Sequence, residues 1–218
     1  MASLAPPPLP PQLRPRKAPR QPRAAATRAR ILAAARATFE AHGYSHGTTN
    51  RIAAAAGLSV GSLYQYFPNK DAILVELVDL HIEAGTVALR AALADVLATA
   101  DDGPPPLPEL IGATTAALVA LHATDRRLHR VLFEEAPRPP EQLARLRALE
   151  AELTATVAAL LTGHPDVRVA DPAVAARLVI DTVESLVHRV ATDDASGIAD
   201  DVLATEITRM IVAYLTAA

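Results

Sequence analysis

Three polar residues late in the chain have types and a spacing that could do chemistry. Glu184 and His188 are four residues apart, and Asp181 lies one turn earlier on nearly the same helical face. Carboxylate and imidazole groups placed in this way can bind a metal ion or recognise a polar ligand. More often, a Glu and a His at this spacing form an intrahelical pair or a satisfied polar position in a subunit interface, so we expect no metal ion.

The sequence gives no support for catalysis. The H-E-x-x-H, P-loop and Rossmann glycine patterns are missing, and the absence of Cys excludes thiolate nucleophiles, disulfides and Cys-ligated zinc. We therefore predict that the protein is not an enzyme and needs no cofactor. A chain without Cys suits a reducing, cytoplasmic location, and no run approaches the roughly 20 consecutive apolar residues that span a bilayer, so we expect no membrane partner.

Positive charge is concentrated at the start of the chain. The first 70 residues hold ten Lys and Arg against one acid, Glu40, whereas the remainder holds 11 bases and 23 acids. The two parts therefore carry net charges of +9 and −12. A basic module attached to an acidic body is typical of a protein that binds a polyanion with one end.

The segment between residues 48 and 70 has the turn chemistry of two short helices joined by a tight turn. Thr48 or Thr49 can cap the first helix, Gly57 can take the positive φ that closes it, and Ser59 can cap the second. These positions predict a helix-turn-helix.

The same segment has side chains of the right size to pack as a small domain. Ala53 is small enough for the two helices to cross closely, and Leu63 can fill the crevice between them. The other expected core residues are Ile31, Ala35, Phe39, Ile52, Ala56 and Phe67.

The run from Thr27 to about Glu83, above all GLSVGSLYQYFPNK at residues 57–70, resembles the DNA-binding domain of the TetR/AcrR family. The resemblance implies a transcriptional regulator with a recognition helix of about Val60 to Phe67. At a rise of ~1.5 Å per residue this helix makes about two turns, enough to seat its N-terminal end in a major groove of double-stranded operator DNA.

The resemblance also implies which side chains meet DNA. The residues expected to face bases are Asn50, Val60, Gly61, Ser62 and Gln65. The residues expected to contact phosphates are Thr48, Thr49, Ser59, Tyr64, Tyr66 and Lys70, since hydroxyls, an ammonium group and helix N-terminal amides suit anionic oxygens. Gly61 stands where larger residues are usual, so the protein should depend more on DNA shape there.

Residues 1–24 form a separate, Pro-rich segment. They hold eight of the 18 prolines, five bases and no acid. We expect a disordered or polyproline-like tail, since this composition cannot bury much apolar surface. It would serve as a solvated extension or as an arm for the DNA backbone, and less readily as a PxxP-type ligand.

The remaining pattern predicts an all-α chain of about nine helices. From Ala25 the apolar spacing is helical, Gly43 should end the first helix, and Gly or Pro breaks separate the later ones. We expect an N-terminal three-helix helix-turn-helix domain at residues 25–70 and a helical ligand-binding and dimerisation domain at residues 71–218.

The last two long helices, about Pro172–Thr192 and Ile198–Leu215, have apolar stripes. The resemblance implies that they form a four-helix interface with a second copy, and an intrachain core is the alternative. The stripe residues are Val174, Leu178, Asp181, Val183, Leu186, Val187 and Val190 on the first helix, and Val202, Ile207, Ile211, Val212 and Leu215 on the second.

The part of the chain after residue 70 is almost purely aliphatic, because Phe133 and Tyr214 are its only aromatic residues. A pocket there would suit a small, largely aliphatic effector better than a flat aromatic cation. The polar and aromatic residues expected to line it are His81, His122, Arg126, Arg130, Phe133, Glu184 and His188.

These observations favour a repressor released from its operator by such an effector. Two other readings stay open: an activator or architectural DNA-binding protein without a small-molecule effector, and a helical binding protein or enzyme that has lost its DNA function.

Overall fold

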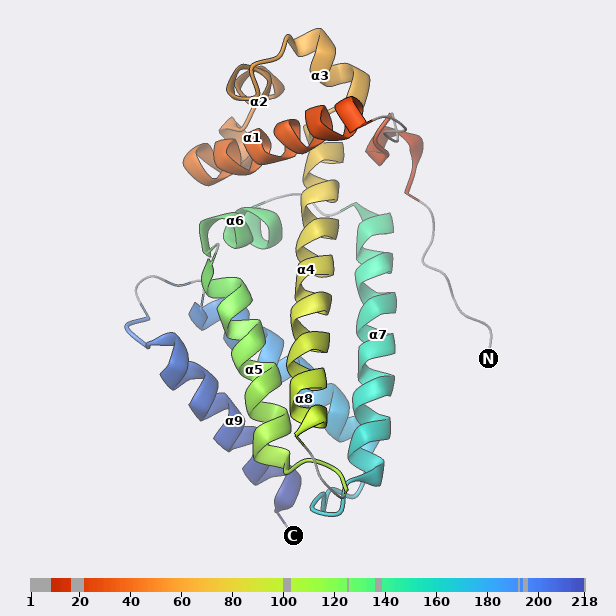
Figure 1. Ribbon diagram of the computed structural model, residues 1–218, viewed down its shortest axis with the longest axis vertical. Helices are drawn as coiled ribbons and strands as arrows, with labels where there is room; N and C mark the ends of the chain where they lie inside the picture. Colours follow the sequence, from red (N-terminus) through yellow and green to blue (C-terminus); the bar gives the residue numbers. More distant parts are fainter. Residues whose placement is uncertain are drawn as a thin grey trace. The chain divides into compact units, whose positions relative to one another are not determined.

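A computed structural model of the chain describes residues 9–16, 22–99, 103–124, 126–135, 139–191, 193 and 196–217. Over these residues the chain forms nine α-helices and no strand, which confirms the all-α prediction (Figure 1). Contacts group the chain into two units: residues 1–82 with 127–146, and residues 83–126 with 147–218. The predicted domain division between residues 70 and 71 stays a prediction.

The first unit begins with three helices: α1 (Pro22–His46), α2 (Thr49–Ala55) and α3 (Val60–Tyr66). It also holds the start of α4 (Lys70–Ala98), most of α6 (Arg126–Arg130), the π-helical turn Val131–Glu135 and the start of α7 (Pro140–Gly163). Pro22 opens α1 three residues earlier than expected, since proline suits the first turn of a helix. Gly43 breaks α1 as predicted, with a φ of 69°.

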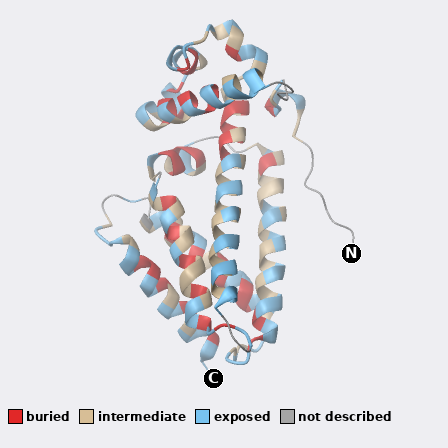
Figure 2. Cartoon of the chain, viewed as in Figure 1, coloured by how far each residue is buried: buried red, intermediate tan, exposed pale blue. Residues whose placement is uncertain are grey.

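The core of the first unit contains every residue that the sequence predicted for it. Ile31, Phe39, Ile52, Leu63 and Phe67 are fully buried and belong to one cluster with Ile73 and Leu74 of α4. The start of α4 is accordingly largely buried in Figure 2, so the helix that follows the helix-turn-helix is fixed to it by apolar packing.

The second unit packs α5 (Leu107–Thr124), the later parts of α4 and α7, α8 (Pro172–Leu186) with the π-helical turn Val187–Ala191, and α9 (Asp200–Thr216). Asp171 caps α8 by accepting from the Ala173 and Val174 N–H groups at 2.9 and 3.2 Å. The longest shared face joins α5 to α9 (Figure 1). Its core is aliphatic and includes Leu107, Val119 and Ile207.

Helix α5 is long and apolar enough to cross a membrane by length and composition, with a mean hydropathy of 1.2 over 18 residues. Its buried residues, however, recur about once per turn, at Leu107, Ile111, Thr115, Val119 and His122. The three aliphatic ones belong to the core that α5 shares with α9, the pattern of a helix packed on one face within a helical domain.

Part of the N-terminal segment differs from the expected disordered tail. Residues 9–16 include a 3₁₀ turn, Pro11–Leu13, in which Leu13 is buried. The Arg16 N–H donates to the Tyr66 carbonyl at 2.8 Å, and the Asn69 side-chain amide donates to the Gln12 carbonyl at 3.1 Å. The carbonyls at the end of a helix need partners, and this segment supplies one. The rest of the expected tail, residues 1–8 and 17–21, lies outside the described residues.

Candidate nucleic-acid interface

Side-chain caps begin both short helices of the helix-turn-helix. Thr48, rather than Thr49, caps α2 by accepting from the Arg51 N–H at 3.3 Å. Ser59 caps α3 by accepting from the Ser62 N–H at 3.1 Å, as predicted. A capping hydroxyl satisfies one of the free N–H groups at a helix start and sets the direction in which the helix leaves the turn.

Gly57 closes α2 in the left-handed conformation, with a φ of 64°. The Leu58 N–H then donates to the Ala53 carbonyl at 2.9 Å, which completes the turn. The Arg30 guanidinium of α1 donates to the Ala56 carbonyl at 2.5 Å, so α1 also holds the end of α2. The fully buried Ala53 and Leu63 fill the angle between α2 and α3.

None of the residues predicted to meet DNA is buried. Six are exposed: Thr48, Asn50, Ser59, Gly61, Tyr64 and Gln65. Five are half-buried: Thr49, Val60, Ser62, Tyr66 and Lys70. Much of α3 is therefore exposed (Figure 2), whereas Leu63 is fully buried.

Two hydrogen bonds order the hydroxyl groups on this surface. The Tyr64 and Thr49 hydroxyls lie 3.3 Å apart and link α3 to α2, and the Ser59 and Ser62 hydroxyls lie 2.8 Å apart. Each hydroxyl can still accept or donate one further bond, so the surface holds donors for phosphate oxygens in fixed positions.

Lys70 is held by Tyr44 at the kink of α1. Its ammonium donates to the Tyr44 carbonyl at 2.9 Å and lies 3.9 Å from the centre of the Tyr44 ring. The Tyr44 hydroxyl bonds the Asp71 carboxylate, and burial, together with this acceptor and its charge, raises the pKa of Tyr44 above its ordinary value. Lys70 thus joins α1 to α4, and its predicted phosphate contact would use its remaining N–H groups.

Gly57, Ser59 and Gly61 also have the G-x-S-x-G spacing of a hydrolase nucleophile. In hydrolases this pattern lies on a sharp turn from a strand to a helix. Here it joins two helices, and the Ser59 hydroxyl contacts the Ser62 amide and hydroxyl. The spacing therefore reflects the turn and the cap of α3.

Comparison with protein families decides which helical class this is. The family model described as "Bacterial regulatory proteins, tetR family" matches residues 31–77, and the one described as "Tetracyclin repressor-like, C-terminal domain" matches residues 106–215. The chain belongs to the TetR family. It is a DNA-binding transcriptional regulator, and its helix-turn-helix is the family's DNA-binding module.

Solved structures have the same fold at low sequence identity. A TetR-like transcriptional regulator from Rhodococcus sp. RHA1 is 21% identical with a TM-score of 0.67, and the match covers 93% of this chain and 100% of that one. NalD of Pseudomonas aeruginosa, the secondary repressor of the MexAB-OprM multidrug efflux pump, is 20% identical with a TM-score of 0.70, covering 90% and 99%. A comparison with curated protein sequences found no match.

Three of the residues predicted to line an effector pocket lie in the first unit of this TetR-family protein. His81 and Phe133 are 5.5 Å apart between ring centres and share a ring cluster with His129, which stacks on Phe133 at 4.4 Å. Arg130 is half-buried on α6. The structure thus brings His81 and Phe133 together, with His129 as the third ring of the cluster.

The other four predicted pocket residues lie in the second unit. His122 and His188 meet edge to face with ring centres 4.8 Å apart. His122 is buried with its Nδ1 2.7 Å from the Leu118 carbonyl, and burial lowers its pKa. Glu184 as a whole is exposed, but its carboxyl group loses part of its hydration, and this loss, followed by the charges of Glu150 and Asp181, raises its pKa.

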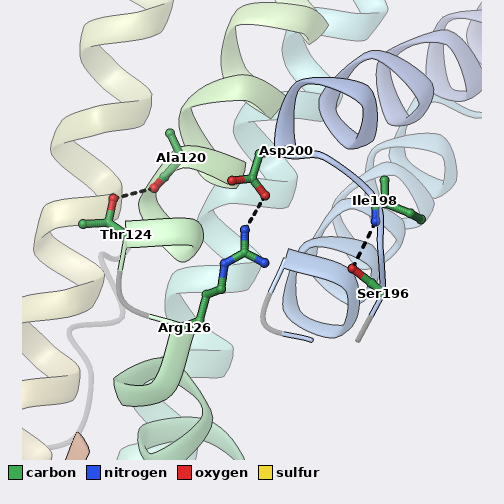
Figure 3. Close-up of polar contacts among 6 residues, drawn as sticks. All are labelled: Ala120, Thr124, Arg126, Ser196, Ile198 and Asp200. Atoms are coloured by element: carbon green, nitrogen blue, oxygen red, sulfur yellow. Dashed lines mark hydrogen bonds and ion pairs between the residues drawn. The ribbon is translucent and has the colours of Figure 1, made fainter. Parts of the chain in front are cut away.

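Asp181, the third member of the trio that the spacing suggested, is engaged by an arginine one turn earlier. Its carboxylate accepts from Arg177 at 2.8 Å, and Arg177 also pairs with Glu150 of α7. Arg126 is likewise engaged, since it donates to Asp200 at the start of α9 at 2.7 Å (Figure 3). This ion pair joins the first residue of α6 to the α9 N-terminus, where a carboxylate also suits the helix dipole.

A groove of about 750 Å³ lies between α5 and α9 of the second unit, and its lining is largely apolar. Small residues leave the space: Gly112 and Ala116 on α5, and Ala204, Thr205 and Ala213 on α9. None of the seven predicted pocket residues lines it. The signal that could have found it is the spacing of Gly112 and Ala116, which puts two small residues on one face of α5.

Proposed function

We propose that this TetR-family regulator acts in the cytoplasm as a homodimeric repressor that leaves its operator when a small, largely aliphatic effector binds. The observation that carries the proposal is the outward presentation of α3, a short helix capped by Ser59 and anchored by the fully buried Leu63 and Phe67. A rigid, buried underside with an open polar face is what a base-reading helix needs.

The exposed face of α3 would enter the major groove with its N-terminal end. Gln65, together with Asn50 on α2, can pair with adenine edges, since an amide offers one donor and one acceptor. The ordered hydroxyls of Ser59, Tyr64 and Thr49 would bond phosphates on either side of the groove. Phosphate contacts position the protein, and the few base contacts select the sequence.

Dimerisation is supported by apolar side chains that lie exposed on α8 and α9. Val174 and Leu178 on α8 are 54% and 49% exposed, and Val202, Met210 and Tyr214 follow one another along one face of α9 with exposures of 50%, 45% and 42%. Two packed helices with such outer faces can form a four-helix interface with a second copy. A two-fold partner would place two recognition helices about one DNA turn apart, near 34 to 36 Å.

An aliphatic effector is supported by the second unit, whose core is aliphatic and whose groove is lined mostly by small or apolar side chains, with Asp201 and Arg209 as its charged residues. Its binding would favour a dimer shape in which the two recognition helices no longer match the DNA repeat. The coupling must be reciprocal, with a size of about 1 to 3 kcal/mol. An effector that binds equally well with and without operator would contradict release by this route.

The DNA contact can be tested with Ser59→Asp and the DNA that flanks the protein's own gene. Aspartate caps helices as well as serine does, so we expect unchanged folding, whereas a carboxylate facing phosphates should weaken DNA binding tenfold or more. For the wild type, the logarithm of affinity should fall linearly with the logarithm of salt concentration, by about 0.9 per neutralised phosphate.

The matched control is Ala199→Asp. It adds the same charge at the N-cap of α9 in the second unit, where no side chain makes the cap at present. Its affinity for the same DNA should stay within about twofold of the wild type, because at physiological salt charges more than ~8 Å apart are largely screened. Wild-type binding that does not depend on salt, or equal losses in both variants, would overturn the assignment of α3.

A further inference from the structure

Residues 9–16, which we call the N-terminal arm, dock on the C-terminal end of α3. The Arg16 N–H donates to the Tyr66 carbonyl at 2.8 Å, Asn69 donates to the Gln12 carbonyl at 3.1 Å, and Leu13 is only 7% exposed. We propose that this arm is a second DNA-binding element, in which Arg14 and Arg16 contact the phosphate backbone beside the recognition helix. The inference rests on the proposed mode of DNA binding and adds a site to it.

Both guanidinium groups are available to a polyanion. Arg14 and Arg16 are exposed, and neither has an ion pair with a carboxylate in the described part of the chain. Arg16 donates from Nη1 to the Tyr64 carbonyl at 3.4 Å, and Arg14 donates from Nε to the Leu9 carbonyl of its own segment. Each guanidinium has five N–H donors, so most remain free for phosphate oxygens.

The position of the arm suits a phosphate contact. Helix α3 has seven residues, which at ~1.5 Å per residue gives a length of about 10 Å. The major groove is about 12 Å wide. When the N-terminal end of α3 lies in the groove, groups attached to its C-terminal end therefore lie near the sugar-phosphate strand that borders the groove.

The arm is also held in one conformation before DNA arrives. Pro10, Pro11 and Pro15 fix three φ angles, and two hydrogen bonds and the buried Leu13 fix its place on the domain. A basic tail without such anchors would lose conformational entropy on binding, whereas a docked arm loses little. Docking thus holds the guanidinium groups of Arg14 and Arg16 near one place before DNA binds.

The test measures the salt dependence of binding for the full-length double variant Arg14→Gln/Arg16→Gln. The probes are the DNA flanking its own gene and a random duplex of equal length. If each arginine neutralises one phosphate, the slope of log affinity against log salt should fall by about two, and affinity for both duplexes should fall by about tenfold or more at physiological salt.

The matched control is Arg147→Gln/Arg189→Gln, which removes the same charge from exposed positions of the second unit. Its slope should be unchanged. Because Arg16 also touches the end of α3, the single variant Arg14→Gln keeps the test valid if the double variant is unstable, and it should lose about one unit of slope. Leu13→Ser keeps every charge but frees the arm, and should lose most of the affinity that the arginines contribute.

The outcomes separate this proposal from the previous one. If binding by the wild type depends on salt but Arg14→Gln has the wild-type slope, DNA binding by the recognition helix stands and the proposed phosphate contacts of the arm are wrong. Normal affinity in Leu13→Ser would overturn its docked placement. If the wild type binds neither duplex, both proposals fail together.

Discussion

Tyr44 uses four groups to join parts of the first unit that are distant in sequence. Its N–H donates to Glu135 at 3.0 Å, its carbonyl accepts from Lys70, its ring lies beneath the Lys70 ammonium, and its hydroxyl bonds Asp71. The partners lie 26 to 91 residues away, and no local pattern relates them. From the sequence, Tyr44 could therefore be placed only as one more aromatic residue of the basic third of the chain.

The first prediction concerns the pH dependence of stability. The folded state raises the pKa of Tyr44 by burial and by its bond to Asp71, so the folded chain keeps the neutral phenol while the unfolded chain ionises at a pKa of about 10. The contribution of Tyr44 to the free energy of unfolding is fully present below about pH 10. It is lost as pH rises above that value, by at most about 1.4 kcal/mol per pH unit. Denaturant unfolding at increasing pH should show this fall in the wild type and a shallower one in Tyr44→Phe.

Tyr44→Phe should also lower the free energy of unfolding at neutral pH by about 1 to 3 kcal/mol, because Asp71 loses a hydrogen bond. Tyr214→Phe is the control, since Tyr214 is 42% exposed and its ring is kept. Parallel alkaline losses in the wild type and Tyr44→Phe would assign the pH dependence to other groups.

Among the elements, the helix-turn-helix was the most predictable, because its devices are local. Gly57 and Ser59 act as their residue types and spacing predicted, with a positive φ at Gly57 and a side-chain cap at Ser59. Only the choice between Thr48 and Thr49 was left open, and it depends on which residue stays extended before the first turn; Thr48 does, with a ψ of 153°. The residues that form a turn and its caps lie within four or five positions of one another, so they can be recognised without knowledge of the tertiary fold.

The second prediction pairs two glycines of this element. Gly57→Ala forces a methyl-bearing residue into the left-handed region and brings its Cβ to 3.3 Å from the Arg30 guanidinium, so unfolding should become easier by about 1 to 2 kcal/mol. Gly61→Ala lies within α3, where the nearest atom to the new Cβ is the Ser59 hydroxyl at 3.9 Å, and should stabilise by about 0.5 to 1 kcal/mol.

Thermal unfolding of the two variants measures the difference, and opposite signs are expected. A destabilised Gly61→Ala variant would mean that α3 is not helical at Gly61, and a Gly57→Ala variant of unchanged stability would mean that the turn does not need its glycine. Gly61→Ala should also change the preference among DNA sequences, because it adds a methyl group to the exposed face of α3.

The two C-terminal helices were harder to interpret, because an apolar stripe can pack either in the chain's own core or against a second copy. Val183, Val187, Ile207, Ile211 and Leu215 were expected at a dimer interface, but they are buried in the second unit's own core. For these residues the intrachain alternative is correct. Val174, Leu178 and Val202 are exposed as an interface requires, and Met210 and Tyr214 join them although they lay outside the stripe.

At the scale of the whole molecule, the grouping of residues by their contacts differs from their order in the sequence. Residues 127–146 group with the first 82 residues, through contacts such as the ion pair of Arg145 with Asp79 at 2.9 Å and the bond of Glu135 to Tyr44. Residues that are distant in sequence thus lie in the same unit. Such a return of the chain depends on long-range packing, which composition and periodicity do not report.

The last prediction tests the dimer. A recognition helix of seven residues offers few base contacts, so tight operator binding requires two copies joined together, and joining two binding modules typically raises affinity 10²- to 10⁴-fold. Leu178→Lys places a charge from each copy in the proposed α8 and α9 face. We expect sedimentation to report a monomer and operator affinity to fall by about a hundredfold or more, while binding of each monomer to random DNA persists.

The control is Val87→Lys, which makes the same kind of change at a residue of α4 that is 62% exposed and outside that face. It should stay dimeric and bind the operator normally. Because Leu178 is 49% exposed, its replacement costs the monomer little apolar burial, and a normal unfolding transition at low protein concentration will separate loss of pairing from loss of folding. A Leu178→Lys protein that remains dimeric with full operator affinity would place the subunit interface on other helices.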